Sequence, residues 1–112
     1  MSRKYKIRDQ EKLYFVSFAV VNWIDVFSRK QYKDILIKSL NYCQENKGLE
    51  LYAYVIMSNH VHLIVGTKGS SRLEDIIRDF KKYTSVTILK AIKENPKESR
   101  REWFPNGLKS LK

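Results

Sequence analysis

The chain has 112 residues, one cysteine and a formal net charge of +10 at pH 7, with 22 basic against 12 acidic side chains. This length suits one domain with a modest core, and a lone cysteine excludes an intrachain disulfide framework. No apolar run approaches the roughly 20 residues of a membrane-spanning helix. We therefore expect a single cytoplasmic domain over residues 1–112, with no membrane association.

The positive charge is concentrated at the two ends of the chain. Residues 1–12, a basic arm that contains Arg3 and Lys4, carry five basic and two acidic side chains, and residues 67–112 carry twelve and six. Residues 13–66 are nearly neutral, with five basic and four acidic side chains. A positive electrostatic field of this kind suits binding to a phosphate backbone, because basic side chains neutralise the phosphates and release their counterions. A nucleic acid is the expected partner, and an anionic membrane surface is the competing one.

The first half of the chain predicts a strand followed by a helix. Residues 13–21 are aromatic and β-branched without a charged side chain, which is typical of a central strand buried on both faces. Apolar residues then recur at helical spacing over residues 29–46, where Ser28 and Gln31 resemble a capping box. Gly48 supplies a stop for this helix.

The second half predicts a hairpin followed by a longer helix. Residues 51–57 and 59–67 have the composition of strands, and only a very tight connection separates them. Helical periodicity then extends over residues 71–93, beginning at a second capping box. Residues 94–112 form an irregular basic tail without a sustained period.

The order β-α-β-β-α, over a core of residues 13–93, predicts an α+β fold of the ferredoxin-like split βαββα(β) type. Its antiparallel sheet carries both helices on one face. The fourth strand of that arrangement is expected to be missing, because Glu102–Phe104 is too short and Pro105 follows it. An unpaired edge of the first strand then favours a partner chain, an unusual contact of the tail, or aggregation.

Two histidines flank one apolar residue in the predicted strand 59–67. Side chains alternate across a strand, so His60 and His62 share one face, and the apolar residues between and after them form the other. The apolar face is expected to pack on the helices, which leaves the histidines accessible. Imidazole is the commonest metal ligand, so the pair predicts half of a divalent-metal site. Surface histidines or hydrogen-bonded core histidines are the alternative interpretation of the same spacing.

The segment Tyr54–Val65, with the sequence YVIMSNHVHLIV, closely resembles the signature of the single-tyrosine HUH transposases. The branch it resembles is the IS200-like and REP-associated one. Further matches to that branch lie at residues 14–25, 42–46 and 80–85, and the resemblance extends from about residue 13 to residue 103.

The resemblance implies a ferredoxin-like nuclease fold, usually a dimer, that acts on hairpins of single-stranded DNA. It also implies that His60 and His62 hold Mg²⁺ or Mn²⁺, which polarises the scissile phosphate, and that a tyrosine attacks the phosphorus. Because a tyrosine hydroxyl with a pKa near 10 is a weak nucleophile, the metal is needed to offset charge on the transferring group.

The nucleophilic tyrosine of the family has no match in this chain. The resemblance places it on a helix after the fourth strand, together with a further polar metal ligand, whereas the one tyrosine after the histidines is Tyr83. A truncated or frameshifted copy that keeps the metal ligands is the simplest interpretation. Tyr83 lies at the margin of an apolar stripe, so its ring is expected to pack on the sheet, and a role as nucleophile is the alternative.

Other polar residues are candidates for supporting roles. Arg78, Lys81 and Lys82 are predicted to lie off the apolar stripe of their helix and to contact DNA phosphates together with Arg3 and Lys4, although a solvated helix face has the same pattern. Asn59 is either a turn residue only or a partner that orients His60.

Three functions are compatible with these features. The first is an HUH nuclease domain, active or inactive, that binds single-stranded DNA. The second is a non-catalytic nucleic-acid-binding module on the same scaffold. The third is a regulatory remnant that dimerises with an intact transposase through its exposed strand edge.

Overall fold

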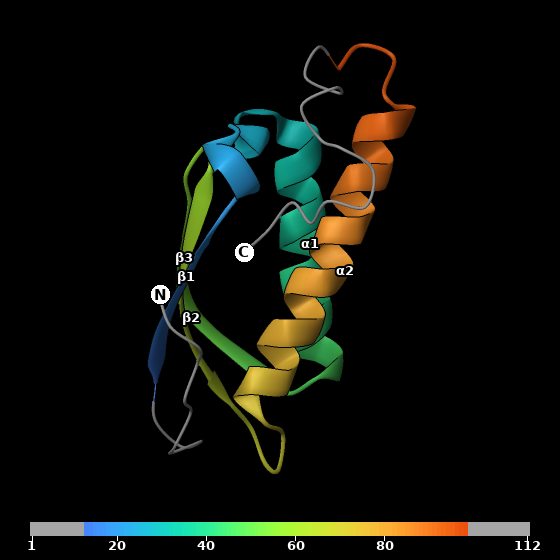
Figure 1. The fold of residues 1–112 in the computed structure, drawn as a ribbon. Coiled ribbons are helices and arrows are strands. Elements are labelled where there is room, and N and C mark those ends of the chain that lie inside the picture. The colour runs from blue at the N-terminus through green and yellow to red at the C-terminus, as the bar shows by residue number, and fades with distance from the viewer. Residues whose placement is uncertain (1–12, 99–112) are drawn as a thin grey trace.

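Residues 13–98 are described by a computed structural model, in which three antiparallel strands form a sheet and two long helices cover one of its faces (Figure 1). Two short 3-10 turns, Val21–Trp23 and Val26–Ser28, follow the first strand. The longer elements are, in chain order, β1 (Tyr14–Ala19), α1 (Lys30–Asn46), β2 (Leu49–Ile56), β3 (His60–Thr67) and α2 (Leu73–Glu94). The predicted α+β class and the order β-α-β-β-α are confirmed.

The central strand of the sheet is β3, not β1. The strand order is β1-β3-β2, because β2 and β3 form the predicted hairpin and β1 pairs with the other edge of β3. The prediction that the first strand is buried on both faces is also wrong. Val16 and Phe18 are buried against the helices, whereas Phe15 is 60% exposed on the opposite face. Both helices cover the same face, so neither of them covers the other face of the strands.

The core lies between the sheet and the two helices. On β3, Val61, Leu63 and Val65 are fully buried, as the alternation predicted. The helices contribute buried residues at the expected helical spacing: Tyr32, Leu36, Leu40 and Cys43 from α1, and Ile76, Ile77, Phe80, Ile88 and Ile92 from α2.

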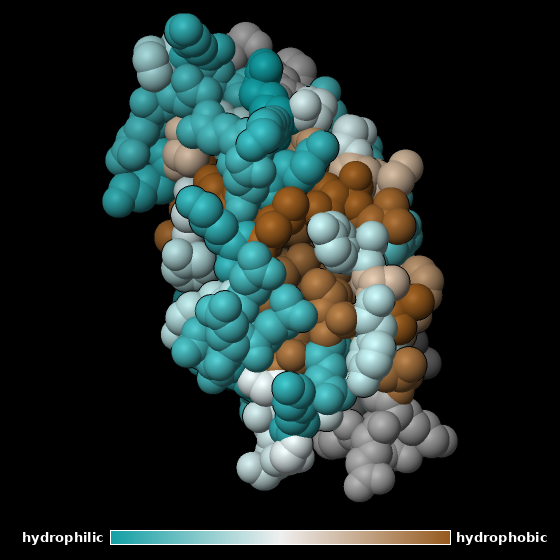
Figure 2. Space-filling model, turned by 180° about the vertical axis from the view of Figure 1, so that it is seen from behind, coloured by the Kyte–Doolittle hydropathy of each residue, from teal (hydrophilic) through white to brown (hydrophobic). Residues whose placement is uncertain are grey.

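The surface of this domain keeps many large apolar side chains. Figure 2 shows hydrophobic residues in the middle and on the right-hand side of the molecule, and hydrophilic residues on the left. The exposed large hydrophobic residues are Leu13, Phe15, Trp23, Tyr42, Tyr52, Tyr54, Val55, Met57, Ile64, Tyr83 and Val86. Of these, Tyr42, Tyr83 and Val86 line one groove between α1 and α2, and an exposed apolar patch of this kind often marks an interaction site.

The ends of the elements differ from the sequence-based expectation in two respects. Strand β1 ends at Ala19 rather than at residue 21, because the backbone takes positive φ angles at Asn22 (60°) and Trp23 (56°). Neither predicted capping box is formed: the N-caps of α1 and α2 are Arg29 and Arg72, without side-chain capping bonds. The stop after α1 is confirmed, since Gly48 has φ +80°.

An ion pair between an exposed arginine and a buried carboxylate joins the start of α1 to the chain after α2. Glu98 is buried, and its Oε1 accepts hydrogen bonds from Arg29 Nε at 2.8 Å and from the Tyr32 hydroxyl at 2.9 Å. Burial raises the pKa of Tyr32 above its usual value. These contacts hold the irregular segment after α2 against the first turn of α1.

Several expectations fall outside the described residues. The arm with Arg3 and Lys4 and the chain from residue 99 onward lie there, including Glu102–Phe104, where a fourth strand was considered. Within residues 13–98 the sheet has three strands, with β1 at one edge. No helix in this part of the chain is long and apolar enough to cross a membrane.

Candidate metal centre

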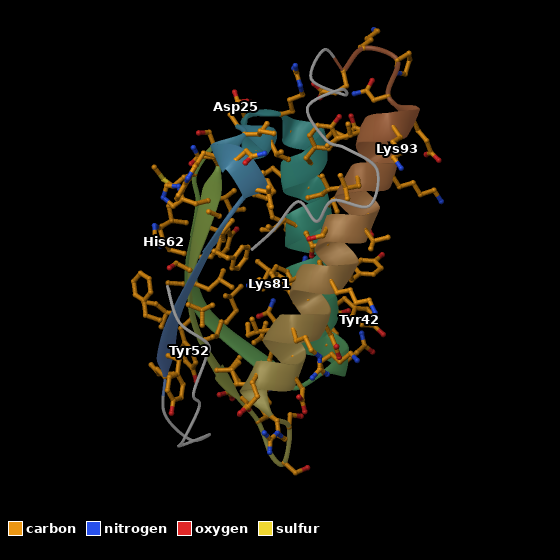
Figure 3. All side chains as sticks on the ribbon, in the orientation of Figure 1. Asp25, Tyr42, Tyr52, His62, Lys81 and Lys93 are labelled. Carbon is orange, nitrogen blue, oxygen red and sulfur yellow. The ribbon has the colours of Figure 1, made fainter. Side chains whose placement is uncertain are left out.

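The two histidines lie at the start of β3, on the face of the sheet that the helices leave uncovered. In Figure 3, His62 is on the side of the sheet away from the helices. The ring centroids of His60 and His62 are 4.8 Å apart, and the ring planes are 81° apart. Their partners on β1, Ala19 and Ser17, have small side chains. Two imidazoles this close can ligate one ion.

Asn59 sets the orientation of His60. Its Oδ1 lies 2.8 Å from His60 Nδ1, and its Nδ2 donates a hydrogen bond of 3.2 Å to the backbone carbonyl of Trp23. When Nδ1 of an imidazole donates its proton to a carbonyl oxygen, Nε2 keeps the lone pair that a metal requires. Asn59 is therefore a turn residue that also fixes the ring of a candidate ligand.

The second ring has an unsatisfied nitrogen. His62 Nδ1 is buried and has no hydrogen-bond partner within the described part of the chain. Such a nitrogen costs about 1–3 kcal/mol when left unpaired, and a metal bound at this nitrogen would offset the cost. The two histidines therefore fit a divalent ion. Residues 13–98 contain no group of three or more His, Cys, Asp or Glu that could hold a metal, so the two histidines are the candidate ligands within this range.

Two aromatic residues that the sequence analysis did not single out flank the histidines. The Trp23 ring meets His60 edge-on, with centroids 6.4 Å apart, and the Phe15 ring meets His62 edge-on at 5.5 Å. The sequence signal for Phe15 was the alternation of side chains along β1, which places Phe15 on the face opposite Val16. No local pattern predicts the register between β1 and β3, so the contact with His62 could not be predicted.

Tyr83 is not where the sequence predicted it. Its side chain is 61% exposed and lines a groove between α1 and α2 together with Tyr42, so the prediction that it packs on the sheet is wrong. Tyr42 lies on the outer side of the helices in Figure 3. A side chain at the margin of an apolar stripe can turn to either flank, and Tyr83 turns toward α1. The helices and the sheet thus separate it from His60 and His62.

The three residues of α2 that were predicted to contact DNA phosphates do not lie beside the histidines. Lys81 lies between α2 and the sheet, with Nζ 5.6 Å from the centre of the Phe18 ring, and burial lowers its pKa. Its predicted place off the apolar stripe is wrong. Arg78 forms ion pairs with Asp75 at 3.0 Å and Asp79 at 3.3 Å. Lys82 lines the groove between the helices.

Comparisons with known proteins agree with this fold. A REP-associated tyrosine transposase bound to a REP hairpin is structurally similar, with a TM-score of 0.63 and 19% identity over 78% of this chain and 53% of that chain. This chain thus spans about half of that protein. A crystal structure of a transposase-like protein from Deinococcus radiodurans R1 is also similar, with a TM-score of 0.60 and 21% identity over 98% and 84%.

Sequence comparison identifies the family. No curated protein gives a significant sequence match. The family described as "Transposase IS200 like" matches residues 13–106, a range that includes the sheet, both helices and the two histidines. The chain therefore belongs to the IS200-like transposase family.

Proposed function

We propose that this chain is an HUH-type domain that binds single-stranded DNA in transposition and holds Mg²⁺ or Mn²⁺ at His60 and His62. The observation that carries the proposal is the pair of adjacent imidazoles on the uncovered face of the sheet, one of them oriented by Asn59. The net charge of +10 supports an anionic partner. A hairpin is the proposed form of that partner, because the similar REP-associated transposase is bound to a REP hairpin.

In this proposal the bound ion supplies charge stabilisation at a phosphate that is cleaved and rejoined. The described residues bind the ion and orient one of its ligands. His60 and His62 present ring nitrogens, and Asn59 holds the first ring so that it cannot rotate away. Two neutral nitrogen ligands leave the remaining coordination positions to phosphate oxygens and water, which suits a catalytic site better than a structural one.

The tyrosine that follows the histidines in sequence does not reach this site. Tyr83, the tyrosine that follows the histidines in sequence, lies beyond the helix layer. This separation favours a second candidate, a module on the same fold that binds nucleic acid without cleaving it. A covalent-adduct assay with a labelled hairpin and Mn²⁺ distinguishes the two, and an adduct that is lost in Tyr83→Phe would contradict the position assigned to Tyr83.

Metal binding is tested directly by titrating the protein with Mn²⁺ and measuring the free ion by electron paramagnetic resonance. We expect stoichiometric binding that is lost when His60→Ala and His62→Ala are combined. Tyr42→Ala, a change at an exposed aromatic residue on the far side of the helices, serves as the control and is expected to bind Mn²⁺ normally. Equal binding by the double variant and the unsubstituted chain would contradict the proposed ligands.

The oligomeric state belongs to the same proposal. We propose a homodimer, because the strand order places β1 at an edge of the sheet and a second chain can extend the sheet there. Light scattering after size-exclusion chromatography measures the mass in solution. A mass equal to one chain at micromolar concentration would contradict the dimer.

A further inference from the structure

Four aromatic rings form a continuous row on the uncovered face of the sheet. The row begins at Trp23, continues through His60 and His62, and ends at Phe15. Successive ring centroids are 6.4, 4.8 and 5.5 Å apart. The two outer rings belong to side chains that are each 60% exposed. The candidate metal ligands thus lie between two exposed aromatic side chains that come from different segments of the chain.

The position of Trp23 carries an energetic cost. Both Asn22 and Trp23 have left-handed backbone angles, with φ of 60° and 56°. Asparagine tolerates this region, but a bulky residue such as tryptophan is an outlier there, at a cost of roughly 1–3 kcal/mol. The Nδ2 of Asn59, whose Oδ1 contacts His60, donates to the carbonyl of Trp23 and holds this turn in place. One side chain therefore fixes both the exposed indole and the neighbouring histidine.

We propose that Trp23 and Phe15 are stacking platforms for the bases of a single strand whose phosphate lies at His60 and His62. The inference rests on the proposed function and adds to it the subsite that holds the nucleotides on either side of that phosphate. Aromatic side chains bind bases of any identity through their ring faces, so the subsite positions the strand without reading its sequence.

The alternation along the row favours a nucleic-acid strand over a protein partner. A single strand presents bases separated by anionic phosphates, which matches two outer apolar rings with nitrogen ligands between them. A protein partner that covered the row would desolvate both imidazoles and would have to satisfy their nitrogens, at about 1–3 kcal/mol for each one left unpaired. The second copy of the proposed homodimer extends the sheet at the edge of β1 and does not have to cover this row.

The test measures the affinity of the full chain for a twelve-nucleotide oligothymidine by fluorescence anisotropy, without added metal. Loss of one stacked base is expected to weaken binding by about 5- to 100-fold, so Trp23→Ala and Phe15→Ala should each show a loss in this range. Trp23→Phe keeps a ring and should retain most of the affinity. The matched control is Tyr42→Ala, which removes an equally exposed ring from the opposite side of the molecule.

A second readout separates stacking from a general loss of structure. The chain has two tryptophans, so Trp103→Phe leaves Trp23 as the one indole, and its fluorescence should be quenched by oligothymidine. An oligonucleotide of the same length without bases should bind more weakly and should not distinguish Trp23→Ala from the unsubstituted chain.

The outcomes distinguish this inference from the proposed function. If the unsubstituted chain binds oligothymidine and the variants at Trp23 and Phe15 bind equally well, the stacking subsite is wrong and the single-stranded DNA function stands. If these variants lose no more affinity than Tyr42→Ala, the subsite is also wrong. If the unsubstituted chain binds no single strand at all, both proposals fail.

Discussion

The side-chain oxygen of Asn59 lies 2.8 Å from Nδ1 of His60, while the amide nitrogen of the same side chain donates to the Trp23 carbonyl at 3.2 Å. One amide thus connects a candidate metal ligand to a strained turn that begins more than thirty residues earlier in the chain. Substitution can remove the donating end of this amide while keeping the accepting end, or can remove both.

Asn59→Ala removes both contacts, and Asn59→Asp keeps the oxygen but loses the donor to Trp23. We expect Asn59→Ala to weaken Mn²⁺ binding by about 10- to 100-fold, which is the usual effect of losing a hydrogen bond to a ligating histidine. Asn59→Asp should keep Mn²⁺ affinity but lower the free energy of unfolding by about 1 kcal/mol, because the Trp23 carbonyl loses its donor. Calorimetric titration and thermal unfolding measure the two effects. Normal Mn²⁺ binding by Asn59→Ala would show that His60 needs no such support.

Gly48→Ala is expected to destabilise the fold more than Gly69→Ala. Both glycines have positive φ, +80° and +61°, so both substitutions strain the backbone. A Cβ at residue 48 would also lie 2.6 Å from Ser71 Oγ, whereas a Cβ at residue 69 meets no atom within 4 Å. Chemical denaturation should therefore give a loss of about 1 kcal/mol for Gly69→Ala and of about 2–3 kcal/mol for Gly48→Ala. Adding Ser71→Ala to Gly48→Ala should recover part of the difference in the free energy of unfolding. Equal losses for the two glycine variants would contradict the close approach of residue 48 to Ser71.

Glu98→Ala is expected to lower the free energy of unfolding by about 1–3 kcal/mol. The substitution leaves the Tyr32 hydroxyl and the Arg29 guanidinium without the buried carboxylate that accepts from both. Glu94→Ala, at the end of α2, is the control, because Glu94 is exposed. Urea denaturation measures both variants. A loss no larger than that of the control would show that the chain after α2 is not held by this contact.

Alkaline pH is expected to destabilise the protein through Tyr32. Burial raises the pKa of Tyr32 in the folded state above the usual tyrosine value of about 10, so the unfolded chain releases this proton first as the pH rises. The stabilisation is complete below about pH 10 and is lost as the pH rises through the pKa of the folded state. Melting temperatures between pH 8 and pH 11 should fall less steeply for Tyr32→Phe than for the unsubstituted chain. Tyr42→Phe, an exposed control, should keep the original slope.

The sequence by itself determined the local features of this protein. The alternation in residues 60–65 fixed which side chains of β3 enter the core, because successive side chains of a strand point to opposite faces. Helical spacing predicted α1 and α2 to within a few residues, since an amphipathic stripe is a property of the segment alone. The histidine motif predicted the family for the same reason, as it is contained in one short segment.

Tertiary structure alone decided what lies around the histidines. The pairing of β1 with β3 makes β3 the central strand and sets Phe15 beside His62, and it depends on a register between segments far apart in the chain. The outward position of Tyr83 and the inward position of Lys81 were decided by the helix packing, because residues at the margin of an apolar stripe face whatever surface lies next to them. Local pattern thus gave the candidate ligands, and long-range packing gave them their aromatic neighbours and kept Tyr83 away from them.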